Sequence, residues 1–325
     1  MTDVSVIICC YNHATYVEQA LESVLSQSIR PSQLIITDDA STDTSAAIIE
    51  SWIDRRWPSA EFLRNDVNVG LPATLNLALA RVRGDFVVIM AADDWMTPER
   101  LETQIGTFAA SSGRVGMVYS DMIEVDEHGV PTGQRWFDPD RMGPPASGDL
   151  FEKMIERAFM AAPTVMTRVD IVRQAGPYDV TLVAEDYDMF LRLSRLAEWE
   201  YIETPLVNYR VLSSSLSRSD HFKQNLRAGR IRMLRKHMNV SETTDLVIAE
   251  RTAKMAESLY KEGRSCRETA ADLRFTLGVH VTNRRLLFYL LARIGVPGDA
   301  IVRSRQHGRA WLGSIRSVFR STGPA

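Results

Sequence analysis

The sequence predicts an α/β protein in which a central sheet is flanked by helices, and three observations lead to this fold class. Residues 86–90 form an unbroken apolar run of strand length, and a strand that is apolar on both faces is normally covered by helices on both sides. Strand-like and helix-like segments alternate along residues 4–91, as in a parallel sheet with helical crossovers. The 325 residues, 45% of them hydrophobic, suffice for a large core.

The N-terminal part is expected to repeat a strand and a helix. Strands are predicted at residues 4–10, 34–37, 62–63 and 86–90, and helices at residues 14–27, 45–57 and 71–81. Thr97 as N-cap and Pro98 at the first helical position predict the start of a further helix. No Gly-rich phosphate loop follows any of these strands, which argues against a dinucleotide dehydrogenase or a P-loop NTPase.

The following segments continue the α/β pattern. Strands are expected at residues 115–119, 121–125, 164–167 and 206–211, and helices at residues 149–159 and from Glu185 onward. Residues 129–148 form a long polar segment with Trp136 and Phe137 inside it, and a loop of that length in a compact domain usually has a function. Exposed aromatic rings there would stack on a sugar, although one of them could equally be anchored in the core. Residues after about His221 are expected to be helical.

Polar side chains follow three of the predicted strands. They are Tyr11 and Asn12, then Asp38 and Asp39, then Asp93 and Asp94. In open α/β sheets ligands bind beyond the carboxyl ends of the strands, where these groups should converge. Neighbouring carboxylates repel each other unless a cation offsets their charge, and Mg²⁺ or Mn²⁺ is commonly held by one or two carboxylates plus substrate phosphates. An anion-and-metal site is therefore predicted, with a solvated loop in which an Asp caps a helix as the alternative.

Four blocks of the sequence occur in an order and spacing that resemble an inverting glycosyltransferase of family 2. The blocks are VSVIICCYNHATYVEQALESVLSQ, LIITDDASTDTS, NVGLPATLNLALA and GDFVVIMAADD. The resemblance spans roughly residues 3–215 and implies the GT-A fold, a Rossmann-like mixed sheet flanked by helices, here with a helical C-terminal extension. It predicts a GT-A domain at residues 1–218, divided into a nucleotide-sugar-binding half (1–112) and an acceptor half (113–218), followed by a basic helical region at 219–325.

The resemblance also assigns the nucleotide-sugar site. It implies that Asp39 hydrogen-bonds the nucleobase of the donor and that Cys9 and Tyr11 line the base pocket. Asn12, which follows the first predicted strand, and Asn68, in the turn-rich segment 65–70, are expected to belong to this site, and Asp93 is expected to lie toward the ribose or the ion. A donor carrying UDP or dTDP is favoured, because an Asp can accept a hydrogen bond from a pyrimidine N3–H.

The metal and the general base are assigned in the same way. Mn²⁺ or Mg²⁺ is expected at Asp94 together with Asp93, although Ala91 stands where many relatives have an acidic residue and Leu212 where relatives often have a His. The segment EDYDMFLRL resembles the family motif in which the Asp, here Asp186, is the general base.

The acceptor side is expected to involve Glu185 and Trp136. Taken together, the resemblance predicts a metal-dependent inverting glycosyltransferase that moves a sugar from a nucleoside-diphosphate donor to a glycan or lipid-linked acceptor in cell-surface polysaccharide or glycolipid synthesis. One alternative is a nucleotidyltransferase, although residues 9–16 lack the glycine and basic residues of its usual triphosphate loop. Another is a catalytically inactive sugar-nucleotide-binding protein, which the departures at Ala91 and Leu212 keep open.

Charge is distributed unevenly along the chain. Leu226 to Ala325 carries 19 Lys and Arg against 8 Asp and Glu, a net charge of +11, so the preceding residues carry −14. Basic residues interleaved with apolar ones predict helices that bind a membrane surface, and not a nucleic-acid site. The alternative is that these helices pack on the acidic catalytic domain or form a homodimer. Three cysteines, no signal peptide and no membrane span predict a cytoplasmic protein, free or peripheral on the inner face of the membrane. The six histidines show no metal-ligand spacing.

Overall fold

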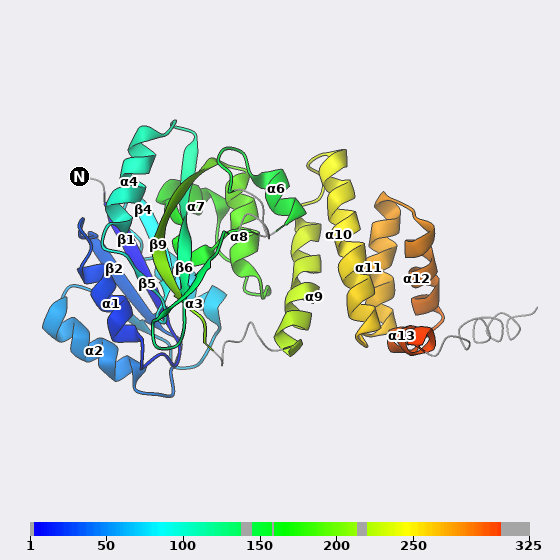
Figure 1. Ribbon diagram of the computed structural model, residues 1–325, viewed down its shortest axis with the longest axis horizontal. Coiled ribbons are helices and arrows are strands. Elements are labelled where there is room, and N and C mark those ends of the chain that lie inside the picture. Colours follow the sequence, from blue (N-terminus) through cyan, green and yellow to red (C-terminus); the bar gives the residue numbers. More distant parts are fainter. Residues whose placement is uncertain (1–2, 138–144, 158, 213–219, 307–325) are drawn as a thin grey trace, which may run out of the picture. The chain divides into compact units, whose positions relative to one another are not determined.

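The structure is a computed structural model that describes residues 3–137, 145–157, 159–212 and 220–306 (Figure 1). The chain divides into two compact units, Met1–Arg218 and Ser219–Ala325. The first unit contains the sheet and the helices that cover it, and the described part of the second unit consists of helices and their connections.

The strands of the first unit form one mixed sheet. They are β1 (Val4–Cys10), β2 (Gln33–Asp38), β3 (Glu61–Arg64), β4 (Phe86–Ala91), β5 (Trp95–Met96), β6 (Val115–Val125), β7 (Pro131–Arg135), β8 (Met166–Arg168) and β9 (Glu198–Arg210). Their order is β3-β2-β1-β4-β8-β6-β9-β5, with β7 paired to β6. The neighbours from β3 to β4 are parallel, β8 is antiparallel to both β4 and β6, and β6 and β9 are parallel. The predicted mixed α/β fold is thus confirmed.

Helices cover both faces of this sheet (Figure 1). They are α1 (Val17–Leu25), α2 (Ser45–Arg56), α3 (Leu71–Leu79), α4 (Arg100–Ala110), α6 (Phe151–Glu156), α7 (Val169–Ala175) and α8 (Glu185–Ser194). Because strand side chains alternate between faces, even-numbered residues such as Val6 and Val88 pack in the core with α1, α2 and α4. Odd-numbered residues such as Cys9, Val87 and Ile89 face the opposite side, where they line a pocket together with α3 and α8.

The second unit has its own hydrophobic core. Its helices are α9 (Asp220–Lys236), α10 (Glu242–Lys261), α11 (Cys266–Val279), α12 (Asn283–Arg293) and α13 (Gly298–Gln306). Buried side chains from α10, α11 and α12, including Tyr260, Leu273 and Phe288, pack together. Within the described residues, no helix combines the length and the apolar character that crossing a membrane would require.

Some predicted boundaries near the site are wrong. Thr97 does not cap α4, which begins at Arg100; instead Trp95 and Met96 pair with β9, and the hydroxyl of Thr97 is buried without a hydrogen-bond partner. The carbonyl of Thr97 accepts a hydrogen bond from Gln27 Nε2 at 2.7 Å. Pairing with a distant strand therefore overrides the local capping signal.

Two predictions in the acceptor half also need correction. The strand expected at residues 164–167 is a 3₁₀ turn, η1 (Ala162–Thr164), followed by β8, and the helix expected at 149–159 is limited to α6. Part of the expected polar loop at 129–148 is β7, which pairs with β6 in a hairpin. Residues 138–144 of that loop lie outside the described part of the chain.

Candidate active site

The loops that follow β1 and β2 are joined by hydrogen bonds. The backbone N–H of Asn12 donates to Ser41 Oγ at 2.9 Å, and the backbone N–H of Thr42 donates to Asn12 Oδ1 at 2.8 Å. Asp38 accepts a hydrogen bond from the N–H of Ser41 at 2.9 Å. Asn12 and Ala40 adopt φ values of 58° and 59°, which are costly for residues with a Cβ and occur often at functional sites. The amide oxygen of Asn12 thus holds the second loop in place.

Asp39 organises the turn at residues 65–70. Its buried carboxylate accepts hydrogen bonds from Asn65 Nδ2 at 2.8 Å, from Val69 N–H at 2.9 Å and from Gly70 N–H at 2.8 Å. Gly70 has a φ of 86°, a conformation that glycine adopts without steric cost. A carboxylate has about four lone-pair sites, so Asp39 retains the capacity to accept one more hydrogen bond. Asn68 lies exposed in the turn that Asp39 supports.

Cys9 and Tyr11 lie at different depths. Cys9 is buried at the end of β1 and lines the pocket beneath α3 and α8. Burial raises the pKa of its thiol to about 12, so the side chain is a neutral, apolar part of the wall at physiological pH. Tyr11 follows the strand and is 44% exposed, which leaves its ring accessible to a ligand.

The adjacent carboxylates after β4 differ in their accessibility. Asp94 is only 3% exposed, and its Oδ1 accepts a hydrogen bond from the backbone N–H of Arg210 at 2.8 Å. Burial raises the pKa of Asp94 well above its usual value, and the negative charge of Asp93 raises it further. The side chain of Asp93 is 19% exposed, and its Oδ1 lies 3.7 Å from Nδ1 of His13. Asp93 is therefore the more accessible of the two carboxylates.

Arg210, at the end of β9, fixes the position of this acidic turn, and sequence reasoning missed it. Its guanidinium donates to four acceptors: the backbone carbonyls of Asp93, Asp126 and Glu127 and the side-chain oxygen of Gln19. The guanidinium carbon also lies 4.4 Å from the ring centre of Tyr16 and 4.9 Å from that of Trp95. The available signal was a lone basic residue in the segment LVNYRVL.

The side chains around Asp93 fit a divalent cation whose ligands are completed by substrate. Within the part of the chain that the structure describes, no three His, Cys, Asp or Glu side chains are grouped closely enough to hold an ion alone. Asp93 offers a carboxylate, and Nδ1 of the neighbouring His13 is buried without a hydrogen-bond partner. Mg²⁺ and Mn²⁺ usually keep waters and substrate phosphates as ligands, so a small protein donor set is sufficient.

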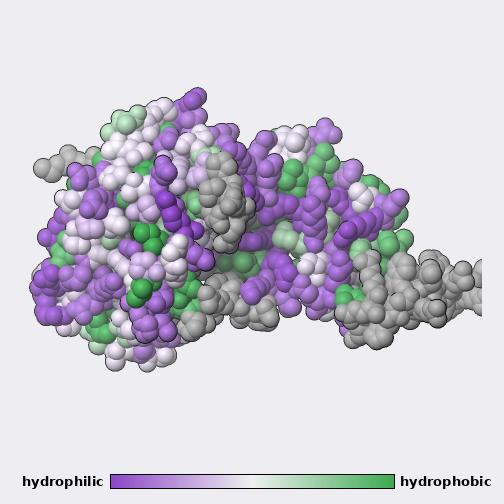
Figure 2. Space-filling model, in the orientation of Figure 1, coloured by the Kyte–Doolittle hydropathy of each residue, from purple (hydrophilic) through white to green (hydrophobic). Residues whose placement is uncertain are grey.

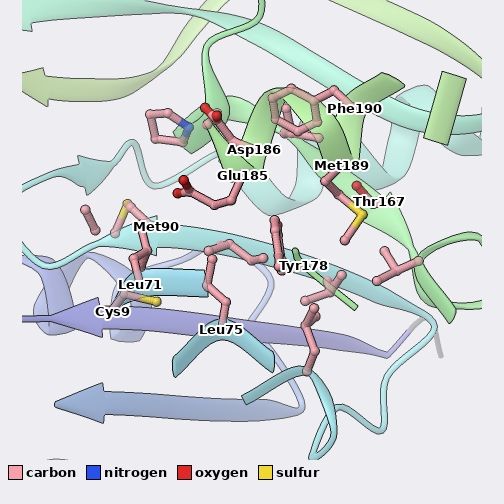
Figure 3. A pocket seen from close by; sticks show the side chains of 18 of the residues that line it. Cys9, Leu71, Leu75, Met90, Thr167, Tyr178, Glu185, Asp186, Met189 and Phe190 are labelled. Atoms are coloured by element: carbon pink, nitrogen blue, oxygen red, sulfur yellow. The ribbon is translucent and has the colours of Figure 1, made fainter. Parts of the chain in front are cut away.

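Glu185 and Asp186 begin α8 and lie at one end of the pocket (Figure 3). The pocket has a volume of about 220 Å³, is mostly apolar and also includes Asp94 in its wall. Burial raises the pKa of Glu185 to about 7, and the charge of Asp186 contributes to this increase. Carboxylates from the turn after β4 and from the start of α8, more than ninety residues apart in the chain, thus line one cavity.

The third carboxylate of the acidic cluster at the start of α8 has a structural role. Asp188 is fully buried, and its Oδ2 accepts a hydrogen bond from Arg192 Nε at 2.9 Å. Arg192 in turn donates to the backbone carbonyl of Gly176 at 3.2 Å. Asp188 therefore helps to anchor the helix that presents Glu185 and Asp186.

Of the two aromatic residues in the segment 129–148, Phe137 is anchored in the core, which is the alternative that the sequence left open, and Trp136 is half-buried. Trp136 Nε1 donates to the carbonyl of Phe159 at 2.8 Å, and the ring packs against a small cluster of buried residues. Phe137 is 6% exposed and packs against the rings of Tyr119 and Tyr201 in tilted and edge-to-face contacts. A large apolar ring gains more from burial than from exposure, which explains the position of Phe137. Trp136 remains half-buried, so its proposed contact with an acceptor stays a prediction.

Comparisons with known proteins identify the family to which the chain belongs. The family description "Glycosyl transferase family 2" matches residues 5–175, more than half of the chain. A Haemophilus influenzae protein named an uncharacterized glycosyltransferase is 27% identical over 70% of this chain and 72% of its own. The amylovoran biosynthesis glycosyltransferase AmsE of Erwinia amylovora is 29% identical over 59% of this chain and 70% of its own.

A solved structure extends the likeness to the whole fold. The crystal structure of S. aureus TarS 1-349, titled as a complex with UDP-GlcNAc, has a TM-score of 0.68 and 16% sequence identity, and the match covers 95% of this chain and 93% of that one. At this identity the likeness concerns the fold alone, which is of the GT-A type. The family match covers β1 to α7, the part of the sheet that carries Asp39, Asp93 and Asp94. The chain therefore belongs to glycosyl transferase family 2 and is a glycosyltransferase with the GT-A fold.

Proposed function

We propose that this protein is a metal-dependent inverting glycosyltransferase that transfers a sugar from a nucleoside-diphosphate donor to an acceptor hydroxyl. The observation that carries the proposal is the pocket in which Asp94 meets Glu185 and Asp186 at the carboxyl edge of the sheet. An acceptor hydroxyl is a weak nucleophile at neutral pH, so a carboxylate must accept its proton during attack. We assign this role to Asp186, and the family resemblance implies inversion at the anomeric carbon.

The donor nucleotide is proposed to bind across the loops that follow β1 and β2. The remaining acceptor capacity of Asp39 suits the N3–H of a pyrimidine, which favours UDP or dTDP. Cys9 and Tyr11 would contact the base, and Asn12 and Asn68 would shape the loops around it. The similar fold of a protein titled as a UDP-GlcNAc complex supports this choice.

The metal is proposed to be Mn²⁺ or Mg²⁺, held by Asp93 and Asp94. A bound divalent ion would neutralise the charge that develops on the departing diphosphate. The more exposed carboxylate of Asp93 would be the main protein ligand, and Asp94, whose Oδ1 accepts a hydrogen bond from Arg210, would contribute its other oxygen. Arg210 fixes this turn with two hydrogen bonds. Its Nε donates to the backbone carbonyl of Asp93, and its backbone N–H donates to the carboxylate of Asp94.

The acceptor is proposed to be a glycan or lipid-linked sugar of a cell-surface polysaccharide, in keeping with the relative named for amylovoran biosynthesis. Glu185 lies beside the proposed base and would contact the acceptor. Trp136 packs in the same small cluster as Tyr209, and Tyr209 lines the pocket. The half-buried ring of Trp136 would therefore support the acceptor side of the site.

The test is incubation of the purified protein with a panel of nucleotide sugars and Mn²⁺, scored for release of free nucleoside diphosphate, with Asp186→Asn as control. Slow release of nucleoside diphosphate by the wild type, lost in Asp186→Asn, supports the proposal. Formation of pyrophosphate from a nucleoside triphosphate and a sugar phosphate would indicate a nucleotidyltransferase instead. Binding of a nucleotide sugar without release, even when oligosaccharide acceptors are added, would indicate an inactive binding protein.

For the C-terminal unit we propose peripheral association with an anionic membrane. Side chains on and beside α12 are exposed by 40–55%: Leu286, Leu287, Leu290 and Ile294. Figure 2 shows hydrophobic residues of this unit at the surface among hydrophilic ones. Several arginines are occupied by ion pairs inside the unit, such as Arg284 with Glu257 at 2.7 Å, but the segment from Leu226 onward still carries a net charge of +11. Apolar side chains beside an excess of positive charge are typical of a membrane-surface helix.

Co-sedimentation with anionic and neutral vesicles tests this second proposal. The intact chain should bind anionic vesicles at low salt, and a variant with Leu286→Ser and Leu290→Ser should bind much less. Absence of binding by the intact chain would remove the proposal. If the same substitutions lower the molar mass of the protein measured without vesicles, the exposed apolar side chains of α12 form a homodimer interface instead.

A further inference from the structure

We infer that His13 supplies a nitrogen ligand to the divalent cation, beside Asp93. The inference rests on the proposed function and deepens it by naming a ligand that the sequence pattern did not indicate. His13 follows β1 in the chain, whereas Asp93 follows β4, and these two strands are adjacent and parallel in the sheet. The fold therefore brings together two side chains that are eighty residues apart.

The backbone of His13 is held from both sides. Its N–H donates to Ser45 Oγ at 2.9 Å, and the hydroxyl of Ser45 donates to Asp43 Oδ1 at 2.5 Å. Its carbonyl accepts hydrogen bonds from the N–H groups of Tyr16 and Val17, both at 2.9 Å. These contacts fix the position from which the imidazole extends, as a metal ligand requires.

The imidazole itself has an unmet bonding requirement. Nδ1 is buried and has no hydrogen-bond partner, and a buried polar atom without a partner costs about 1–3 kcal/mol. Its nearest acidic group is Asp93, whose Oδ1 lies 3.7 Å away, too far for a hydrogen bond. Adjacent ligands of an octahedral ion with bonds of about 2.1 Å lie about 3 Å apart. The two side chains would therefore have to approach each other by less than about 1 Å to share a cation.

Few other protein groups are available to bind the cation, so Nδ1 of His13 would add a needed ligand. Ala91 supplies no carboxylate, and Asp94 is buried with one oxygen engaged by Arg210. A nitrogen donor also affects metal choice, because Mg²⁺ favours oxygen ligands whereas transition ions accept imidazole more readily. The arrangement thus predicts preference for Mn²⁺ over Mg²⁺, and this preference should depend on His13.

The experiment uses the full chain with Mn²⁺ and UDP, and compares wild type with His13→Gln and with His128→Gln, an exposed histidine that serves as control. Electron spin-echo spectroscopy of bound Mn²⁺ should show ¹⁴N coupling in wild type and in His128→Gln, and none in His13→Gln. Titration calorimetry should show at least about 10-fold weaker binding of UDP with Mn²⁺ in His13→Gln, with binding of UDP alone unchanged. Circular dichroism verifies folding, and His13→Asn serves as a second variant.

Three results would overturn the inference. One is metal-dependent UDP binding by wild type without ¹⁴N coupling, which leaves the proposed glycosyl transfer intact. Another is an equal loss of UDP affinity with and without Mn²⁺ in both His13 variants, which would place the imidazole on phosphate. If neither UDP, dTDP nor GDP binds with Mn²⁺, the proposed function fails together with the inference.

Discussion

Replacement of Arg210 by Met should both destabilise the first unit and weaken binding of Mn²⁺ with UDP. The side chain is 4% exposed and makes four hydrogen bonds from a charged donor, each of which contributes about 1.5–3 kcal/mol net. Gln19 and Glu127 are exposed and can be rehydrated after the substitution, so we count the other two of the four bonds. The expected loss is about 3–6 kcal/mol in the free energy of unfolding.

The assay is urea denaturation followed by calorimetric titration with Mn²⁺ and UDP under conditions where the variant is folded. Arg210→Lys should recover part of the stability, because lysine keeps the charge but lacks the planar fork that reaches several acceptors. The matched control is Arg168→Met. Arg168 donates to the Val115 carbonyl at 3.0 Å and lies over Phe86, away from the acidic turn.

Arg168→Met should lose stability but retain affinity for Mn²⁺ and UDP. A loss below about 1 kcal/mol in Arg210→Met would refute the stabilising role of the guanidinium. Equal affinity for Mn²⁺ and UDP in Arg210→Met and wild type would refute its control of the metal-binding turn.

Three further predictions concern the carboxylates. Asp186→Asn should reduce the transfer rate by about 10²–10⁴-fold with nucleotide affinity unchanged, and a variant that keeps more than about a tenth of the rate would exclude Asp186 as the base. Asp39→Ala should weaken UDP binding in calorimetry both with and without Mn²⁺, because the N–H groups of Val69 and Gly70 lose their acceptor; a loss confined to the Mn²⁺ condition would contradict this role. Burial raises the pKa of Glu185 from 4.5 to about 7, so the native state binds this proton more tightly than the unfolded state. The free energy of unfolding should therefore fall by about 3 kcal/mol as the pH rises from 4.5 to about 7. Glu185→Gln should abolish that fall in urea denaturation between pH 5 and 8, and an identical pH slope in both proteins would disprove the assignment.

The sequence by itself determined the alternating elements and the identity of the sheet edge. Apolar runs such as residues 86–90 form strands because both faces of the strand are largely buried, and this requirement is visible locally. The pairs Tyr11 and Asn12, and Asp93 and Asp94, could be assigned to one edge because parallel strands end on the same side. The family motifs then sufficed to recognise a glycosyltransferase.

Only the tertiary structure decided how individual groups at this edge are used. Asp93 and Asp94 are chemically identical neighbours, but the carboxylate of Asp94 is buried and accepts a hydrogen bond from the backbone N–H of Arg210, 116 residues away. Pairing of β5 with β9 likewise displaced the expected helix start at Thr97. The contact between His13 and Asp93 depends on the adjacency of β1 and β4. Such contacts join residues far apart in the chain, and the periodicity of a local segment carries no information about which distant residue will meet it.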